Sequence, residues 1–524
     1  MEAKTPINNV DDDSLLQIFS CYRLEDEDDW YLRLAWLNLV HVCRRWRNLI
    51  YDSWFHLNMG LLLTYDSPSI DTLSHLPPVP LDIDYSDRTR TITRNDEGNL
   101  RLGLQQRGRV RLVALRARSS TLRMWLKPMN DLFPRLRDLS LWSTTTKRIL
   151  VAPELLQAPN LRHLSLHGVG LPKGLSSLSS MTALSTLSLT HIHEHWYFPP
   201  VYLVTQLQGL PYLEELSIGF AIPIPLSSSE GKLLPAPLPP VTLPTMRRLT
   251  FRGVSVYLDN LIAQINTPLL ERLNLTLFSE IDFTLVNLTE FIHRTEGFEC
   301  LLARIIFKED GASIAAQNYE QRVTRKLNLR VKCEPLDWQI DSATQVCNAL
   351  GNVLSAVEEL TLQLNGMPLD WEDELDSMLW HELLLPFVGV KKLYIGSSLT
   401  LELSLSLESV AGMLVLDLLP ELEELEVHLE MGQSNDVFSL FIETRESVAR
   451  PVHLSVPPSQ QTIQPNKLPP LPEDQFKTSF LQFTGSRGIK ISESDLVIDG
   501  LRIDLWALHK AVRAGNGFES VRRQ

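Results

Sequence analysis

Apolar residues recur with one spacing along most of the chain, from about residue 134 onward. An apolar residue is followed by two spacers, a second apolar residue, one spacer and a third, as in Leu136, Leu139 and Leu141. The same triplet begins at Leu161, Leu184, Leu213, Met246, Leu270, Val357, Val390 and Leu422, and more weakly at Val110 and Leu302. The last two apolar positions alternate with a polar one, so each triplet predicts a short strand with one buried face.

Prolines mark the start of these repeats. Six of the nine clear triplets carry a proline two residues before their first apolar position: Pro134, Pro159, Pro211, Pro244, Pro268 and Pro420. Proline is tolerated there because the strand begins after it. The L-x-x-L-x-L pattern is typical of a leucine-rich repeat, so we predict an α/β solenoid over residues 133–430.

The repeats are uneven. First positions are separated by 25, 23, 29, 33 and 24 residues from Leu136 to Leu270. Regular repeats carry Asn or Cys three residues after the triplet, whereas this chain has Val169, Ile192 and Val254 there in three repeats and Asn only at Asn365. We therefore expect an irregular arc rather than an even horseshoe.

Two proline-rich stretches divide the chain further. Residues 223–244 and 451–472 each hold seven of the 32 prolines, which disfavours helix and central strand. We predict a surface insertion at 223–244 and a linker at 451–472 within a C-terminal repeat or cap region, 431–524. Residues 61–132 are predicted to be a linker and the first irregular repeats. In the tail, the stretch 476–483 and the alternation at 489–491 predict one or two further strands.

The N-terminal segment, residues 7–57, has helical periodicity instead. One stripe contains Leu15, Ile18, Phe19 and Tyr22, and a second contains Leu39, Val42, Cys43, Trp46, Leu49 and Ile50. The acidic run 25–29 between them is predicted to be an exposed loop. About 50 residues of helix form a marginal core, so such a module is usually completed by a partner or by the next domain.

These residues resemble an F-box. The stretches INNVDDDSLLQIFSCY and LVHVCRRWRNLIYDSWFHLNM match the family at Leu15, Leu16, Ile18 and Phe19, at Val42, Cys43, Arg44, Trp46 and Arg47, and at Trp54 and Leu57. The resemblance covers about a tenth of the chain. Ile7-Asn8-Asn9-Val10 stands where the family has Leu-Pro, and the acidic loop is longer than in most members. The combination of such a loop with loose repeats resembles the F-box proteins that are abundant in mushroom-forming fungi.

The resemblance implies a non-catalytic substrate-recognition subunit of a Skp-cullin-F-box E3 ubiquitin ligase. The F-box would dock a Skp-type adaptor and, through it, a cullin, while the repeats hold an unknown target protein. The residues expected to bind the adaptor are Ile7, Val10, Leu15, Leu16, Ile18, Phe19, Val42 and Trp46. The alternative is that the N-terminal helices only cap the arc, which would make the chain a leucine-rich-repeat interaction scaffold without ligase association.

Target-binding residues are expected on the exposed face of the repeat strands, at the positions that alternate with the buried leucines. The candidates are Trp142, His167, Arg248, Arg252, Arg272 and Tyr394. The middle of the arc is basic and its end, at Glu424 and Glu426, is acidic. We expect a partner with an acidic patch at the middle repeats; the alternative is that these positions are polar because they are solvated.

Composition and charge limit the classes of partner that the chain is expected to bind. The 524 residues carry a net charge of −14, which argues against binding to a nucleic-acid backbone. The five cysteines form no C-x-x-C motif, so neither a disulfide framework nor a zinc site is indicated. The beginning of the chain lacks the features of a secretory signal, and no apolar run reaches about 18 residues. We expect no membrane contact and a cytoplasmic or nuclear location, or both.

No chemistry of its own is predicted for the chain. His191, His193 and His195 alternate as metal ligands on a strand would, but no fourth ligand stands at an obvious position. Phosphate-binding, nucleophile-elbow and zinc-protease motifs are absent from the sequence. An enzyme within residues 473–524 remains an alternative, although about 50 residues is small for one. The expected fold class is α+β: a small all-α F-box followed by an irregular α/β leucine-rich-repeat solenoid, with no cofactor.

Overall fold

The computed structural model describes residues 10–21, 36–53, 57, 60–65, 67, 79–127, 129, 131–223, 240–278, 283–295, 298, 300–318, 325–333, 335–365, 377–409, 418–429, 437–456, 490–492, 495–498 and 501–504. The chain divides into two compact units. One consists of Met1–Met59 with Gln460–Gln524, and the other is Gly60–Ser459.

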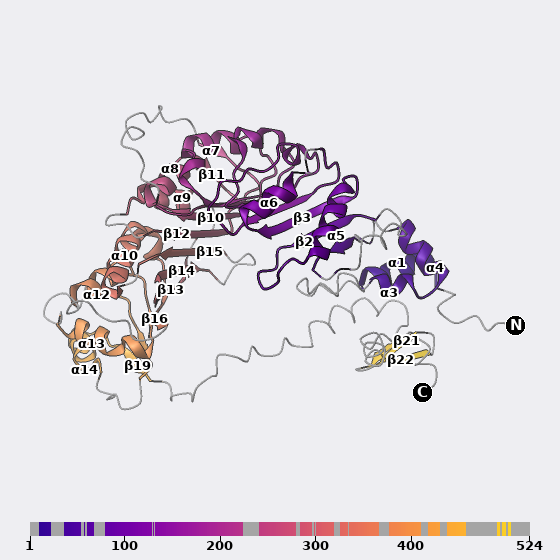
Figure 1. The fold of residues 1–524 in the computed structure, drawn as a ribbon. Coiled ribbons are helices and arrows are strands. Elements are labelled where there is room, and N and C mark those ends of the chain that lie inside the picture. Colours follow the sequence, from indigo (N-terminus) through magenta and orange to yellow (C-terminus); the bar gives the residue numbers. More distant parts are fainter. Residues whose placement is uncertain are drawn as a thin grey trace. The chain divides into compact units, whose positions relative to one another are not determined.

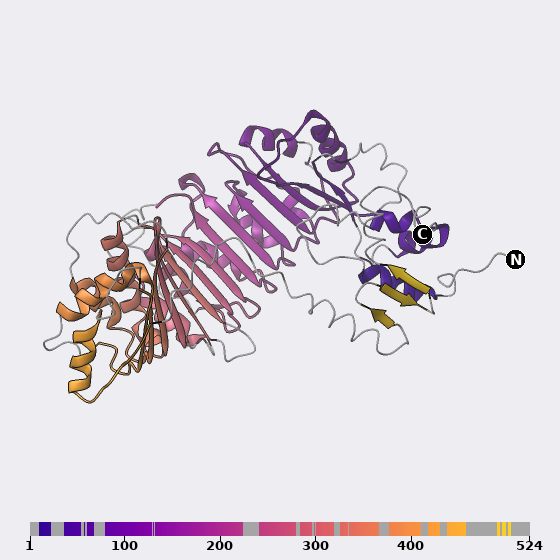
Figure 2. The ribbon, with the colours of Figure 1, turned by 90° about the horizontal axis from the view of Figure 1, so that it is seen from below.

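The Gly60–Ser459 unit is built on one sixteen-stranded sheet (Figures 1 and 2). In spatial order the strands are β1 (Leu61–Leu63), β2 (Leu81–Tyr85), β3 (Val110–Ala117), β4 (Asp138–Ser143), β5 (His163–His167), β7 (Thr186–Ile192), β8 (Glu215–Phe220), β10 (Arg248–Gly253), β12 (Arg272–Leu277), β15 (Lys326–Val331), β14 (Gly311–Gln317), β13 (Leu302–Lys308), β16 (Glu359–Asn365), β17 (Lys392–Ile395), β18 (Glu424–Val427) and β19 (His453–Ser455).

The leucine triplets set the register of this sheet. Leu139, Leu164, Leu187, Leu216 and Leu249 are successive partners in parallel strands, and each is at most 1% exposed. The second apolar residue of each triplet therefore forms one continuous buried row. The strands predicted from the nine clear triplets and the two weak ones are confirmed.

Helices lie along one face of the sheet, and the view in Figure 2 shows the strands of the other face (Figures 1 and 2). Parallel strands require a crossover, and the helices provide most of them. They are α5 (Arg94–Gln105), α6 (Ser119–Leu126), α7 (Pro200–Leu207), α8 (Ser255–Ile262), α9 (Val286–Arg294), α10 (Leu336–Ala349), α11 (Gly351–Leu354), α12 (Ser377–Leu384), α13 (Thr400–Ser409) and α14 (Ser439–Ser447). Shorter 3₁₀ turns are η3 (Leu155–Gln157), η4 (Ser176–Ser180), η5 (Glu194–Trp196) and η7 (Ser397–Leu399).

The sheet departs from the predicted repeat between β12 and β16. Only β13 was predicted there, as a weak triplet, whereas three strands are present. After β12 the chain passes to β13, returns through antiparallel β14 to β15 beside β12, and then crosses through α10 to β16 beside β13. Strand β14 buries Ala312, Ile314 and Ala316. Two of these side chains are too small to form a leucine triplet, so the strand went unrecognised.

Strands of the sheet extend into the segments predicted at both ends of the repeat region. Within residues 61–132, predicted to be a linker and the first irregular repeats, β1, β2 and β3 pair in parallel and continue the sheet. Residues 451–472 are not wholly a linker either, because β19 pairs with β18. Pro451 precedes this strand and therefore interrupts no ladder hydrogen bond.

Smaller strands account for further segments. β6 spans Pro172–Leu175, and β9 (Val241–Thr242), inside the predicted insertion 223–244, pairs with β11 (Ile265–Asn266). Residues 224–239 and 457–489 lie outside the described part, and so does the predicted strand at 476–483. Three strands follow in the other unit, where one or two were expected. β20 (Lys490–Ser492), β21 (Asp495–Ile498) and β22 (Leu501–Asp504) form an antiparallel sheet.

The N-terminal unit contains α1 (Asp12–Cys21), α3 (Trp36–Val40) and α4 (Arg44–Asp52), where helices were predicted. Asp11 caps α1, because its Oδ1 accepts a hydrogen bond from the Ser14 amide at 2.8 Å. Cys43 caps α4 through its Sγ, which accepts from the Trp46 amide at 3.4 Å. The acidic run 25–29 lies outside the described residues. Among the helices that the structure describes, none combines the length and the apolar character needed to cross a bilayer.

Candidate functional site

Helices α1 and α4 share a small core. The rings of Phe19 and Trp46 meet edge to face, with centroids 4.8 Å apart and planes at 63°. Leu15 lies one helical turn before Phe19, and the two are 0% and 2% exposed. Ile50 of α4 is also fully buried. Leu15 and Phe19 therefore hold the helices together and leave little surface for a partner.

Two other predicted adaptor-binding residues lie on the outside. Ile18 is 44% exposed and Val42 is 51% exposed, although both are large and apolar. Val10, Leu16 and Trp46 are half-buried, and Ile7 lies outside the described residues. The predicted set thus separates into internal residues and residues that are free to contact another protein.

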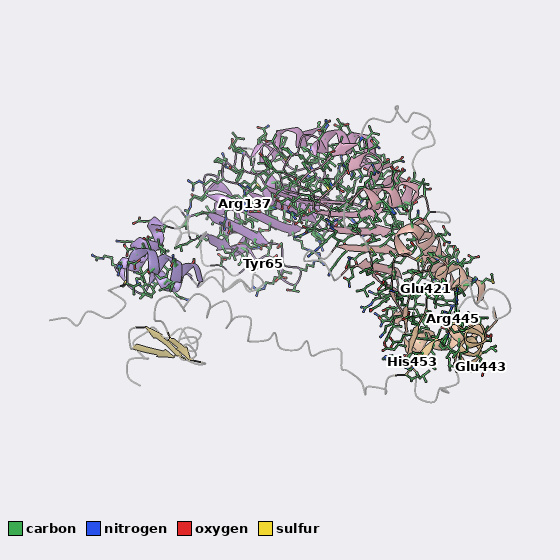
Figure 3. The ribbon with its side chains drawn as sticks, turned by 180° about the vertical axis from the view of Figure 1, so that it is seen from behind. Tyr65, Arg137, Glu421, Glu443, Arg445 and His453 are labelled. Carbon is green, nitrogen blue, oxygen red and sulfur yellow. The ribbon has the colours of Figure 1, made fainter. Side chains whose placement is uncertain are left out.

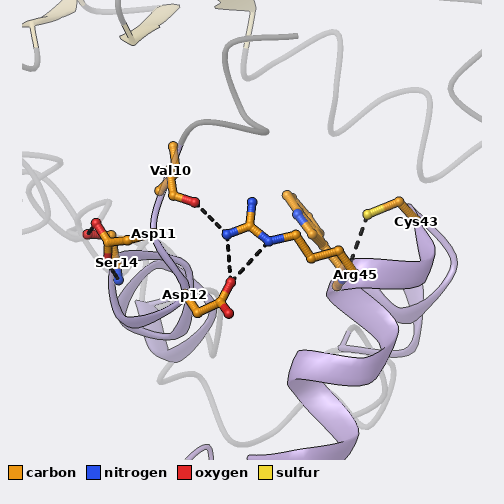
Figure 4. Close-up of polar contacts among 7 residues, drawn as sticks. Val10, Asp11, Asp12, Ser14, Cys43 and Arg45 are labelled. Carbon is orange, nitrogen blue, oxygen red and sulfur yellow. Dashed lines mark hydrogen bonds and ion pairs between the residues drawn. The ribbon is translucent and has the colours of Figure 1, made fainter. Parts of the chain in front are cut away.

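A polar clip ties the start of α1 to α4 (Figure 4). Arg45 donates from Nη2 to the carbonyl of Val10 at 2.6 Å, and from Nε and Nη2 to Asp12 Oδ1 at 3.0 and 2.6 Å. Val10 belongs to the stretch that replaces the Leu-Pro of the F-box pattern. The clip holds Val10, the described end of this stretch, without a proline. Arg45 falls at a variable position of the pattern, so no motif in the sequence selects it.

A second candidate surface is the exposed face of the sheet, where β10, β12 and β15 gather positive charge. Successive partners at the amino ends of these strands are Arg248, Arg272 and Lys326. Arg252 and Arg330 lie at the carboxyl ends, and Lys332 follows β15. We define the cationic patch as Arg248, Arg252, Arg272, Lys326, Arg330 and Lys332. Like charges on neighbouring strands repel, so this arrangement opposes folding unless it is neutralised.

Neutralisation of the patch is partial. Arg248 pairs with Glu215 at 2.8 Å, and Arg330 forms an ion pair with Asp310. Burial lowers the pKa of Lys332, and Arg252 and Arg330 lower it further, while Asp310 acts in the opposite direction. A bound anion would relieve this repulsion, so the patch favours acidic ligands.

A row of amides and hydroxyls separates the two ends of the patch. Thr250, Asn274 and Asn328 are successive partners in the middle of the three strands. Asn328 Nδ2 donates to Asn274 Oδ1 at 2.8 Å, which orients both amides. Remaining donors and acceptors of this row can bind a peptide backbone.

A stacked row of rings and guanidinium groups lies at the carboxyl ends of β3, β4, β5 and β7. Both Arg88 and Arg116 place their guanidinium carbon 4.8 Å from the centroid of the Trp142 ring. His167 stacks on Trp142 with centroids 3.7 Å apart and planes at 17°, and His191 stacks on His167 at 4.9 Å and 12°. We define these five residues as the stacked row.

The stacked row is positively charged but keeps its imidazoles neutral. Burial lowers the pKa of His167 to about 4, and His191, Arg116, Arg88 and Arg252 lower it in the same direction. His167 Nδ1 is 3.0 Å from Thr190 Oγ1, so one ring nitrogen is already in a hydrogen bond. The row therefore presents permanent charge from arginine and neutral rings from histidine.

The six predicted target-binding residues do not form one site. Trp142 and His167 belong to the stacked row, and Arg248, Arg252 and Arg272 belong to the cationic patch. Tyr394 lies on β17, where its ring is 5.0 Å from that of His428. That end of the sheet is charge-balanced, because Lys392 lies 3.2 Å from Glu424 and 3.5 Å from Glu426.

Five charged residues of this face were missed in the sequence: Arg88, Arg116, Lys326, Arg330 and Lys332. Lys326, Arg330 and Lys332 belong to or follow β15, whose alternating pattern was the available signal. Arg116 flanks the weak triplet at Val110, and Arg88 precedes α5 in a segment without strand or helix.

Other candidate sites are weaker. A cavity of about 280 Å³ beside the carboxyl ends of β5 and β7 is lined mainly by apolar residues, including Leu166, Leu189 and Trp196. It is at the lower limit of size for a small-molecule pocket. No three His, Cys, Asp or Glu side chains in the described segments are placed to hold a metal ion. His191, of the predicted histidine trio, contacts His167 and His193 through its ring.

No protein-family model matches the chain, and no curated protein matches it. Seven chains of solved structures match, among them a chain of the crystal structure of the TLR13–ssRNA13 complex. That match has 10% sequence identity and a TM-score of 0.32, and covers 76% of this chain and 52% of the other, so this chain spans about half the length of its neighbour.

Proposed function

We propose that this protein is a substrate-recognition subunit of a Skp-cullin-F-box ubiquitin ligase. Helices α1 and α4 dock the Skp-type adaptor, and the exposed face of the sheet holds the target protein. The observation that carries the proposal is that the F-box-like residues divide into a buried group and an exposed group. Leu15 and Phe19 of α1 form the internal core, while Ile18 of α1 and Val42, in the turn before α4, remain exposed.

The energetics of a small helical unit support docking. Burying an Ile or Val side chain on a partner contributes about 1.5 to 3 kcal/mol. Ile18 and Val42 are only half covered, so part of this free energy is still available. Units of about fifty residues bury a smaller fraction of their surface than larger domains do, and a partner supplies further apolar contact.

The sheet supports the second half of the proposal. Its helix-free face carries the cationic patch and the stacked row, which together expose arginine, histidine and tryptophan. Arginine and tryptophan are enriched among the residues that dominate binding energy at protein interfaces. In the assembly, this chain contributes no nucleophile. It raises the effective concentration of target lysines at the conjugating enzyme.

The test is co-purification with the Skp-type adaptor of the host. We expect wild type to form a stoichiometric complex and an Ile18→Asp, Val42→Asp double variant to lose it, because two carboxylates would be buried at the interface. Val286→Asp is the matched control: Val286 is 80% exposed on α9 in the other unit. It should bind the adaptor as wild type does. Circular dichroism must show unchanged helix content in all variants.

Phe19→Asp is unsuitable as the primary variant. Phe19 is 2% exposed and packs on Trp46, so a buried carboxylate there would unfold the unit and abolish binding for a structural reason. A folded wild type that captures no adaptor, or a double variant that captures it fully, contradicts the proposal. Either result would favour a repeat scaffold without ligase association.

A further inference from the structure

The strand ends that join the stacked row to the cationic patch form a continuous charged strip. Arg252 lowers the pKa of His167 and His191 on one side and that of Lys332 on the other. It therefore lies within electrostatic reach of both groups. We define the C-terminal band as Arg116, Trp142, His167, Arg252 and Lys332.

The cations of this band form no close ion pair with a carboxylate in the described part of the chain, although Asp310 lies within electrostatic reach of Lys332. Arg116 contacts the Trp142 ring, and Arg252 lies over the Phe278 ring at 5.6 Å. Arg252 Nε is buried without a hydrogen-bond partner. Some other cations of the same face are paired, as Arg111 is with Asp82 at 2.5 Å. The band is thus only weakly neutralised in a protein whose net charge is −14.

The ring contacts orient the guanidinium groups. A guanidinium stacked on a ring uses its face there and leaves its N–H edges available, and those edges match a carboxylate in bidentate geometry. Gly219 is the partner of Arg252 on β8, so the neighbouring position of that strand adds no side chain of its own.

We propose that the C-terminal band binds an acidic segment of the target protein in extended conformation, lying across the strands, with Asp or Glu carboxylates on Arg116, Arg252 and Lys332. The inference rests on the proposed function, because it takes the exposed sheet face to be the target-binding surface. Carboxylates fit better than one phosphate because the cations are spread along the band rather than gathered around one point.

The register of the sheet sets the spacing of the acidic residues. Arg116 on β3 and Arg252 on β10 are five strand intervals apart in the sheet order. At about 4.8 Å per interval this is about 24 Å, or about seven residues of extended chain at about 3.3 Å each. Lys332 follows β15, two intervals beyond β10. That is about 10 Å, or about three residues. The expected pattern has acidic residues at positions 1, 8 and 11.

The test uses the full chain and fluorescent eleven-residue peptides. One peptide carries Glu at positions 1, 8 and 11 in a Gln and Ser background, a second carries Glu at 1, 3 and 5, and a third carries none. We expect the first to bind at least fivefold more tightly than the second at equal net charge, in fluorescence anisotropy at low salt. Equal binding of the first two would overturn the proposed register.

Variants locate the contact. Arg116→Gln and Arg252→Gln should each weaken the first peptide by about tenfold, which is the loss of one charge-assisted hydrogen bond. Arg101→Gln is the matched control, since Arg101 is exposed on helix α5. Unchanged affinity in both band variants, or equal loss in the control, overturns the proposal. A fourth peptide with a single phosphoserine at position 8 that binds more tightly than the three-Glu peptide would overturn the choice of carboxylate.

Adaptor co-purification of the same preparations separates this inference from the proposed function. Wild type that captures the adaptor but shows no preference among the peptides refutes the acidic-segment inference alone. Wild type that captures no adaptor refutes the ligase proposal, and spacing-dependent peptide binding would then stand as a property of the sheet.

Discussion

Arg445 of α14 (Figure 3) is hydrogen-bonded to the segment before β18. Its replacement should open that end of the sheet. The side chain is 0% exposed on α14. Nη1 donates to the carbonyls of Leu418 and Leu419 at 3.3 and 3.1 Å, and Nη2 to those of Pro420 and Leu422 at 3.4 and 3.2 Å. The guanidinium therefore satisfies four backbone acceptors of a segment that contains no helix or strand.

The magnitude follows from which acceptors lose their partner. In Arg445→Met, the Leu419 carbonyl keeps a bond from the Leu422 amide, and the Pro420 carbonyl keeps one from Arg450. The carbonyls of Leu418 and Leu422 have no other donor among the described residues. Orphaning a buried acceptor costs about 1 to 3 kcal/mol, and removal of the buried charge offsets part of the sum. We expect a net loss of about 3 kcal/mol.

Hydrogen exchange measured by mass spectrometry is the suitable assay. Repeat proteins lose stability locally, so the loss should appear as about a hundredfold faster exchange in α14 and residues 418–429, with β4 to β8 unchanged. Arg450→Met is the matched control, because Arg450 is exposed and makes one bond to Pro420 at 3.3 Å. It should cost under about 0.5 kcal/mol. Equal exchange in the two variants, or unchanged exchange in Arg445→Met, would refute the reasoning.

Two further predictions concern stability. Burial raises the pKa of Glu402 to about 7, and its Oε2 is buried without a hydrogen-bond partner. The native state then binds more protons than the unfolded state between pH 4.5 and 7, so the free energy of unfolding falls as pH rises through that window. Urea denaturation at pH 5 and pH 8 should show this difference in the free energy of unfolding for wild type and not for Glu402→Gln. An equal difference in the two proteins would mean that other groups cause it. Gly311 has φ +139°, and a Cβ there would lie 1.9 Å from the Val331 carbonyl oxygen, so Gly311→Ala should cost at least about 2 kcal/mol. Gly98→Ala, where nothing lies within 4 Å on helix α5, should stabilise by about 0.5 to 1 kcal/mol; a similar effect of the two alanines in chemical denaturation would contradict the strain argument.

The strands were predictable from the sequence wherever a leucine triplet fixes which residues face the core. The order of pairing between β12 and β16 could not be predicted. The triplet at Leu302 indicates that a strand exists there but not which strands pair with it. The order depends on the tight turn at Gly311 and on burial of Ala312 and Ala316, and neither gives a periodic signal of large apolar residues.

In the candidate sites, too, some residues could be placed from the local sequence pattern, whereas others depend on tertiary contacts. Alternation along a strand placed Trp142, His167 and Arg252 on the exposed face correctly. Arg88 could not be found this way, since it reaches the Trp142 ring only through the fold. In α1, Ile18 and Phe19 are adjacent and equally apolar. Only the packing of Phe19 on Trp46 distinguishes the internal residue from the exposed one.

The net charge of −14 sets how an acidic segment would reach the C-terminal band. At a distance the protein repels such a segment, but at physiological ionic strength this repulsion is screened beyond about 8 Å. Within that distance the nearest charges dominate, and around Lys332 these are Arg252 and Arg330, with Asp310 as the opposing carboxylate. Added salt weakens the local attraction and the long-range repulsion together. Affinity for an acidic peptide should therefore fall less steeply with salt than it would for a basic protein that makes the same three contacts, and a long acidic chain without the required spacing should be excluded.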